Sequence, residues 1–174
     1  MILGMTMEIT KTIDRKNGVF IKRYPYALLV EDRHSVERRC AGIERFSSPI
    51  HLPHSINWTT AYLEIQMPFL KYATRPTARE LRFAKDELVP EIKRAHTCIG
   101  VHGDIRLGNF LSQEGKIFLI DWEPALRQYR RGVVQWITGK RAPADIRNRT
   151  LTVQSDWYAL NIIMRAARSV TTGE

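Results

Sequence analysis

The sequence is poor in cysteine and contains no long apolar stretch. We interpret its two cysteines, Cys40 and Cys98, as buried free thiols within predicted helices of a cytoplasmic protein, not as a disulfide or a metal site. No apolar run approaches the length of a membrane span, and the apolar start at residues 1–3 is too short for a signal peptide. Internal repeats and low-complexity segments are also absent, which excludes solenoid and linker-like chains.

Acidic residues are scarce relative to basic ones. The chain of 174 residues has 18 acidic and 27 basic side chains, and its net charge of +9 favours an acidic partner. A nucleotide, an acidic protein face, nucleic acid or an anionic membrane would all satisfy this charge. Hydrophobic residues make up 44% and charged residues 26%, which is ordinary for a globular protein. The length predicts one domain, 1–174.

Residues 101–123 contain the most informative pattern. A loop carries Asp104 and, five positions later, Asn109; a strand–turn–strand over residues 110–120 then ends on Asp121. A tight hairpin therefore brings three oxygen-bearing side chains to one end of a small sheet. Hard divalent cations prefer oxygen ligands, so Asn109 and Asp121 can hold Mg²⁺. Asp104 then remains free to orient an attacking hydroxyl.

This pattern resembles the catalytic loop and the metal-binding aspartate of the protein-kinase-like superfamily. The His-Gly-Asp of residues 102–104 replaces His-Arg-Asp, and the Asp-Trp-Glu of residues 121–123 replaces Asp-Phe-Gly. Both departures are similar to those of aminoglycoside kinases, choline kinases and atypical protein kinases. The resemblance implies ATP and Mg²⁺ as cofactors. It also implies an α+β, two-lobed fold with a small antiparallel-sheet N-lobe and a truncated, mainly helical C-lobe. The alternative is a hairpin with incidental surface acids.

The implied N-lobe covers residues 1–66. We expect strands at 7–13, 19–24, 55–60 and 62–67, and a helix that begins after Asp32 or Ser35 and runs through Phe46. The strand Val-Phe-Ile-Lys resembles the one that carries the phosphate-binding lysine of kinases, so we assign that role to Lys22. Glu37 is our first choice for the glutamate that pairs with Lys22, and Glu44 is the second. Either glutamate could instead form a helical salt bridge with a nearby arginine.

Glycines are missing where kinases use them to cover the nucleotide. Apart from the turn residue Gly18, only Gly4 precedes the second predicted strand, so the glycine-rich loop is absent, reduced or built without glycines. Residues 66–70 would form the hinge between the lobes. By the resemblance, backbone groups of Gln66, Met67 and Phe69 would hold the adenine.

The implied C-lobe covers residues 71–174. Thr77 and Glu80 fit a capping box that opens a helix running to about residue 95, and Pro90 within it predicts a kink or two abutting helices. Only about 33 positions separate the hinge from His102. Kinases of the aminoglycoside type usually carry a larger helical insertion here, so its absence favours a protein acceptor.

Three further residues have expected roles around the loop. Arg106 would steady the transferring phosphate, although a solvated loop arginine is an equal alternative. His102 would pack at the base of the loop and hold the backbone without taking part in the chemistry. Asp156, near the start of a predicted helix that runs to residue 167, would tie that helix to the backbone of the loop.

The segment after Asp121 is basic and lacks several sequence features of a kinase activation segment. No Ala-Pro-Glu sequence is visible, and Thr138 and Thr150 are the serine or threonine residues that remain. We favour a docking surface for an acidic peptide or phosphate over a solvated charged loop. Its basic residues are Arg127, Arg130, Arg131, Lys140, Arg141, Arg147 and Arg149.

Together these observations predict a minimal Ser/Thr protein kinase that transfers the γ-phosphoryl of ATP to a protein hydroxyl. Three alternatives stay open: a small-molecule kinase, a pseudokinase that binds a partner without chemistry, and a kinase-like module associated with RNA. Compact kinases of this kind also resemble effectors that bacteria deliver into host cytoplasm. We expect no membrane partner.

Overall fold

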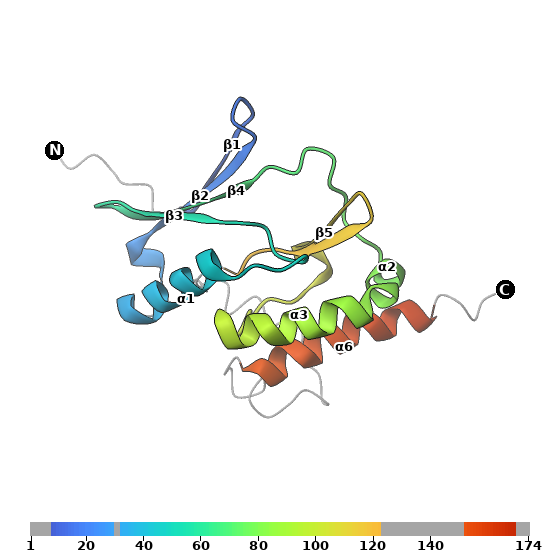
Figure 1. Cartoon of the computed structure of the whole chain (residues 1–174). Coiled ribbons are helices and arrows are strands. Elements are labelled where there is room, and N and C mark those ends of the chain that lie inside the picture. Colours follow the sequence, from blue (N-terminus) through green and yellow to red (C-terminus); the bar gives the residue numbers. More distant parts are fainter. Residues whose placement is uncertain (1–7, 30–31, 123–151, 170–174) are drawn as a thin grey trace.

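The structure is a computed structural model that describes residues 8–29, 32–122 and 152–169. It has an α+β fold with a small antiparallel sheet, a separate β-hairpin and several helices (Figure 1). The strands are β1 (Thr10–Asp14), β2 (Val19–Pro25), β3 (Ser55–Trp58), β4 (Tyr62–Pro68), β5 (Phe110–Gln113) and β6 (Lys116–Leu119). The helices are α1 (Arg33–Arg45), α2 (Ala78–Phe83), α3 (Lys85–Cys98) and α6 (Val153–Ser169), with short 3-10 turns at Tyr26–Leu28 and Leu107–Asn109.

The larger sheet has the strand order β1-β2-β4-β3, with every pair antiparallel. The expected turn joins β1 to β2: the Asp14 carboxylate accepts from the backbone N–H groups of Lys16 and Asn17, and Gly18 has φ +64°. A positive φ is inexpensive only for glycine, so this hairpin is specified locally. The predicted strands at 55–60 and 62–67 are confirmed as β3 and β4.

One face of this sheet is covered by α1. Leu63, Ile65 and Met67 of β4 are buried there against Val36 and Cys40 of the helix. Fully burying an aliphatic side chain of this size contributes about 2 kcal/mol relative to leaving it exposed. The helix begins as predicted, with the Asp32 side chain accepting from the N–H of Ser35.

Helix α1 also meets the end of α3. At Gly42 of α1, a Cβ atom would lie 2.4 Å from the carbonyl oxygen of Cys98. Glycine is therefore required at this crossing because the two backbones touch. The Arg39 guanidinium, one turn earlier, donates to the carbonyl of Val101 at 2.6 Å. The sheet and α1 are thus held directly against the chain that enters the loop at residues 102–109.

The helical segment after residue 77 is interrupted at a different residue from the expected Pro90. The capping box of Thr77 and Glu80 is confirmed, but the two abutting helices meet at Ala84. Pro90 lies inside α3 without ending it, since its missing N–H affects only one bond, that to the carbonyl of Asp86 in the first turn.

One of the two cysteine predictions is wrong. Cys40 is buried as predicted, whereas Cys98 is an exposed thiol. Helix α3 and the residue after it bury Leu88, Ile92, Ala95 and Ile99. Cys98 lies about 100° around the helix from Ile99, off the buried face.

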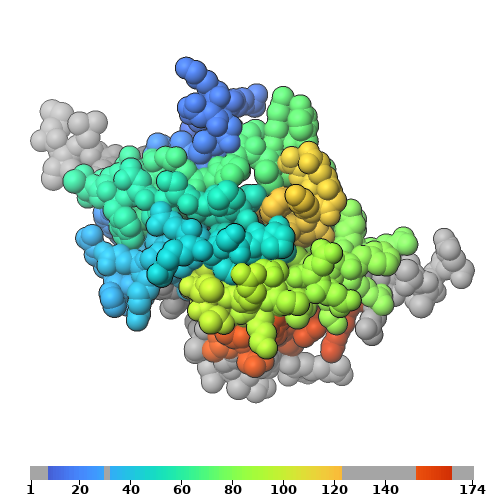
Figure 2. All heavy atoms as spheres, viewed as in Figure 1, coloured from blue at the N-terminus to red at the C-terminus, as the bar shows by residue number. Residues whose placement is uncertain are grey.

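A second, larger hydrophobic cluster joins α2, α3, α6 and the β5–β6 hairpin, and the end of α1 contributes Ile43 to it. Figure 1 shows α3 and α6 side by side below the hairpin. Figure 2 shows the segment after α1 lying against that hairpin, where Leu119 N–H donates to the carbonyl of Ile50 at 2.9 Å. In the part of the chain that the structure describes, no helix combines the length and apolarity needed to cross a bilayer.

Candidate active site

Lys22 and Asp121, 99 positions apart in the sequence, form an ion pair. Lys22 lies in the middle of β2, on the sheet face that α1 covers, and only 3% of its side chain is exposed. Asp121 follows the last residues of the hairpin. A buried ammonium is costly without a partner, so this pair fixes the sheet against the hairpin at one defined point.

The backbone at Asp121 is strained and held from both sides. Its φ is +67°, a conformation that costs a non-glycine residue about 1–2 kcal/mol. The preceding residue, Ile120, donates its N–H to the carbonyl of Asn109 at 2.9 Å and accepts from His102 Nε2 at 2.8 Å. These two bonds maintain the strain and place the Asp121 carboxylate beside the loop.

Asp104 and Asn109 are both buried and in direct contact. Asn109 Nδ2 donates to the main-chain oxygen of Asp104 at 2.8 Å and to its Oδ2 at 2.9 Å. Because both partners are acceptors, the atom between them must be the amide nitrogen. Asn109 Oδ1 therefore points away from Asp104 and is free to meet a cation. Arg106 Nε lies 3.1 Å from Asp104 Oδ2 on the more exposed side.

The Asp104 carboxyl is 5% exposed, and its pKa is raised above the ordinary aspartate value. Burial is the main cause, and the negative charge of Asp121 raises the pKa further. The charge of Arg106 and the Asn109 hydrogen bond act in the opposite direction. A raised pKa makes this carboxylate a better proton acceptor than a solvent-exposed aspartate.

His102 holds the loop in shape, as predicted. Its Nδ1 accepts from the backbone N–H of Asp104 at 3.1 Å, so Nε2 carries the proton that is donated to Ile120. The ring also packs edge-on against Trp122, with centroids 4.6 Å apart. One imidazole thereby links the residue that carries Asp104 to the chain that carries Asp121.

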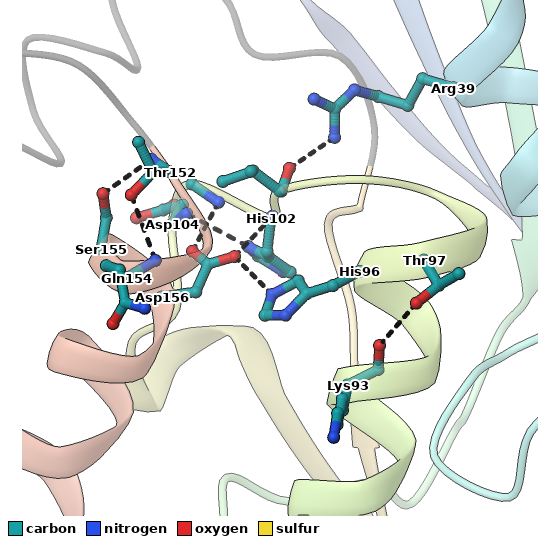
Figure 3. Close-up of polar contacts among 12 residues, drawn as sticks. Arg39, Lys93, His96, Thr97, His102, Asp104, Thr152, Gln154, Ser155 and Asp156 are labelled. Carbon is teal, nitrogen blue, oxygen red and sulfur yellow. Dashed lines mark hydrogen bonds and ion pairs between the residues drawn. The ribbon is translucent and has the colours of Figure 1, made fainter.

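Asp156, at the start of α6, supports the same loop from below (Figure 3). Its carboxylate accepts from the N–H of His102 at 2.7 Å and from that of Gly103 at 2.8 Å. His96 of α3 donates to it through Nε2 at 2.9 Å. The predicted tie between Asp156 and the loop backbone is confirmed. The contribution of His96 was not foreseen from the sequence, because a histidine on a helix face carries no distinct signal of its own.

The expected partner of Lys22 on α1 is wrong. Glu37 is 45% exposed and accepts from Arg33 Nε at 2.8 Å, a pair between successive turns of α1. Glu44, the second choice, accepts from the backbone N–H of Ile56. Glu37 lies about 100° around the helix from the buried Val36 and so faces solvent. The acid that meets Lys22 comes from the hairpin instead.

The three hinge residues lie at the end of β4, but their backbone groups are engaged within the sheet. The N–H of Phe69 donates to the carbonyl of Gly18 at 2.8 Å. Hydrogen-bonded pairs alternate along an antiparallel ladder. The backbone N–H and C=O of Met67 are therefore also directed toward β2, and those of Gln66 toward Ser55 of β3. The Phe69 N–H and the ladder groups of Gln66 and Met67 are therefore engaged, and the expected backbone contact to adenine stays a prediction for the Phe69 carbonyl.

The same alternation exposes two other backbone groups that the sequence reasoning missed. By this alternation the carbonyl of Pro68, the last residue of β4, is directed away from β2, beyond the last pair that β3 makes with β4. Leu70 follows two residues after the end of the strand. Among the described residues, the Leu70 N–H has no hydrogen-bond acceptor. An acceptor and a donor two residues apart on a strand edge can pair with a planar heterocycle. The strand register is the signal that would have found them.

The inner face of the sheet is apolar beside this edge. Ile13, Phe20 and Met67 form one cross-strand row, and Ile13 is 41% exposed although it is a large aliphatic side chain. Lys22 belongs to the next row, two residues along β2. The exposed side chain of Ile13 thus leaves one end of this apolar row open, next to the row of the buried ammonium.

Cation-binding capacity here is limited to oxygen donors. Among the described residues, no group of three or more histidine, cysteine, aspartate or glutamate side chains could hold a metal ion. Asn109 Oδ1 and the Asp121 carboxylate suit Mg²⁺, which commonly takes one or two protein oxygens and completes its shell with water and phosphate. The residues present therefore fit Mg²⁺ only together with a phosphate ligand.

The basic stretch from Arg127 to Arg149, with Thr138 and Thr150, lies outside the described residues, as does Glu123. The sequence matches no protein-family model, and no curated protein matches it. The geometry at Lys22, Asp104, Asn109 and Asp121 is therefore the basis for a functional proposal.

Proposed function

We propose that this protein is an ATP-dependent phosphotransferase of the protein-kinase-like type, acting on a protein hydroxyl. The observation that carries the proposal is the Lys22–Asp121 ion pair at the loop where Asp104 and Asn109 meet. Four side chains of three chemical kinds, from three separate stretches of chain, converge there. A structural ion pair alone would not need a buried aspartate with a raised pKa beside it.

Each of these side chains has a role that its environment supports. The Lys22 ammonium binds phosphate oxygens, and its buried stem restricts it to one direction. Asp104 accepts a hydrogen bond from the acceptor hydroxyl, orients it and takes its proton as the new bond forms. Asn109 holds Asp104 in place through two hydrogen bonds, so the carboxylate is preorganised before substrate arrives.

Asn109 Oδ1 and the Asp121 carboxylate would hold Mg²⁺ together with the phosphates of the nucleotide. When bound, the ion would neutralise charge on the phosphate oxygens. Asp121 has a second task in this account, because its contact with Lys22 keeps the ammonium directed at the same phosphates. Arg106, half-exposed beside Asp104, would meet the negative charge of the transferred group.

The nucleotide base has a matching place on the sheet. The adenine ring would pair with the Pro68 carbonyl and the Leu70 N–H and lie on the row of Ile13, Phe20 and Met67. Two residues along a strand span about 6.6 Å. The row that holds Lys22 would therefore lie beside the phosphates when the base lies on the row of Ile13. We assign the sheet with α1 as the N-lobe and the larger cluster as the truncated C-lobe. The short path between them, through α2 and α3, leaves a protein as the favoured acceptor.

The proposal is tested by turnover of Mg²⁺–ATP with γ-labelled nucleotide. Wild-type protein should transfer label to protein acceptors in preference to aminoglycoside or choline acceptors. Asp104→Asn should lower kcat by about 10³-fold with little change in KM for ATP, because proton transfer and positioning are lost while binding is kept. Lys22→Met should raise KM for ATP and also lower kcat.

Equal rates for wild type and Asp104→Asn would refute the assignment. Binding of Mg²⁺–ATP without any transfer, in wild type and variants alike, would instead support the pseudokinase alternative. Label on a small molecule alone would refute the protein acceptor.

A further inference from the structure

We propose that Lys11 is a second phosphate-binding lysine, which together with Lys22 binds the phosphates of the nucleotide from the inner face of the sheet. This inference rests on the proposed function and deepens it. It begins from the register of β1 and β2, in which Lys11 lies directly opposite Lys22. Residues opposite each other in an antiparallel pair share a face, with Cβ atoms about 5 Å apart. Lys11 therefore stands on the inner face, beside the buried ammonium.

Two lysines in this arrangement repel each other. Like charges directly opposite across a ladder are destabilising, and Asp121 is engaged by Lys22. Lys11 is exposed, and within residues 8–29, 32–122 and 152–169 it makes no ion pair. A bound anion would convert this repulsion into attraction for both lysines. The register therefore places the two lysines where both can contact one polyanion.

The neighbouring row explains why the anion would be a nucleotide phosphate and not an isolated ion. Ile13, two residues beyond Lys11 on the same strand and face, is 41% exposed beside Phe20. The inner face thus presents an apolar row followed by a row with two cations. A base attached to a polyphosphate has the same sequence of apolar and anionic parts at about the same spacing.

Backbone donors do not fill this role in the described hairpin. Gly18 is its one glycine, at the end far from Lys11, and its carbonyl accepts from the N–H of Phe69. A nest of glycine N–H groups, which could cradle phosphates, is therefore not available between β1 and β2. A side-chain cation on β1 supplies the missing positive charge.

The test is calorimetric titration of the full chain with Mg²⁺–ATP and, separately, with adenosine. Lys11→Met should weaken ATP binding about 10- to 30-fold, the loss expected for one charge-assisted contact, and leave adenosine binding unchanged. Lys11→Arg should retain most of the ATP affinity. Lys16→Met, in the exposed turn of the same hairpin, is the matched control and should bind ATP as wild type does. The nucleotide-free melting temperature of Lys11→Met should not fall, because the substitution removes a repulsion.

Two failures are distinguishable. If wild type binds ATP and Lys11→Met binds it equally well, this inference is overturned and the proposed function stands. If wild type binds neither ATP nor adenosine, both fall. Parallel weakening by Lys11→Met and Lys16→Met would also overturn the inference, because it would indicate a diffuse effect of net charge.

Discussion

At the scale of single residues, the candidate site is governed by burial of charge. Lys22 and Asp104 are almost fully buried, and both are tolerated only because specific partners surround them. Burying such charged groups lowers the stability of the fold unless partners compensate for the lost hydration. Two predictions follow from the direction of the pKa shifts.

The first concerns the buried charge of Asp104. Because its pKa is raised in the folded state, the unfolded chain releases this proton more readily, and stability falls as pH rises through the interval between the two pKa values. Asp104→Asn removes this penalty and keeps the hydrogen bond to Asn109. The variant should therefore melt at or above the wild-type temperature at pH 7.5, with the advantage shrinking toward pH 4. A melting temperature several degrees below wild type at pH 7.5 would contradict the prediction.

The second concerns His51, which is buried between Phe46 and His54. Burial, with the charge of His54, lowers its pKa to about 4. Between these two pKa values His51 is protonated in the unfolded chain but not in the folded protein. The free energy of unfolding therefore decreases as pH falls from about 6.5 toward 4. Between pH 7.5 and 4.5 this amounts to about 2 to 3 kcal/mol.

Urea unfolding at these two pH values measures the effect. His51→Gln should lose less stability on acidification than wild type by that amount, whereas His34→Gln, on the exposed face of α1, should lose as much as wild type. An unchanged loss in His51→Gln would refute the assignment.

At the scale of elements, two contacts determine how α1 and α6 support the loop. Helix α1 touches the end of α3 at Gly42, and α6 reaches the loop through Asp156. Both contacts involve backbone, so small substitutions there should have large effects. Two further predictions belong to this scale.

Gly42→Ala should destabilise the protein by about 1–3 kcal/mol. The added Cβ would lie 2.4 Å from a backbone oxygen that can move only with α3, and this overpacking outweighs the better helix propensity of alanine. Gly108→Ala is the matched control, because its Cβ meets nothing within 4 Å and stability should change little. The free energy of unfolding measures both, and equal stability of Gly42→Ala and wild type would refute the crossing.

Asp156→Ala should lower stability by about 3 kcal/mol or more. It leaves the N–H groups of His102 and Gly103 buried without an acceptor and removes the partner of His96. Hydrogen exchange of these two amides reports the loss directly, since they should exchange much faster in the variant. If both amides stay protected, α6 does not hold the loop.

At the scale of the whole molecule, local patterns were predictable from the sequence and long-range pairings were not. The β1–β2 turn, the Asp32 cap and the Thr77–Glu80 capping box follow from interactions within four residues, and all three are confirmed. The break at Ala84 and the exposure of Cys98 were missed, because tertiary packing decides which face of α3 is buried.

The same division applies to the candidate site. The hairpin that brings Asn109 beside Asp121 is nearly local, so its geometry could be read from spacing. The Lys22–Asp121 pair spans 99 positions and was not predicted. The resemblance placed both residues in one site, but it named Glu37 of α1 as the partner of Lys22, which is wrong. Lys11, Pro68 and Leu70 become visible only from the strand register, which a single sequence leaves undetermined.

The most direct measurement is mass spectrometry of a cell lysate incubated with the protein and ATP carrying a heavy γ-phosphoryl group. The account predicts heavy phosphate on serine or threonine side chains with wild type, and none above background with Asp104→Asn or Asp121→Asn. Heavy phosphate at the same sites and to the same extent with all three proteins would contradict it.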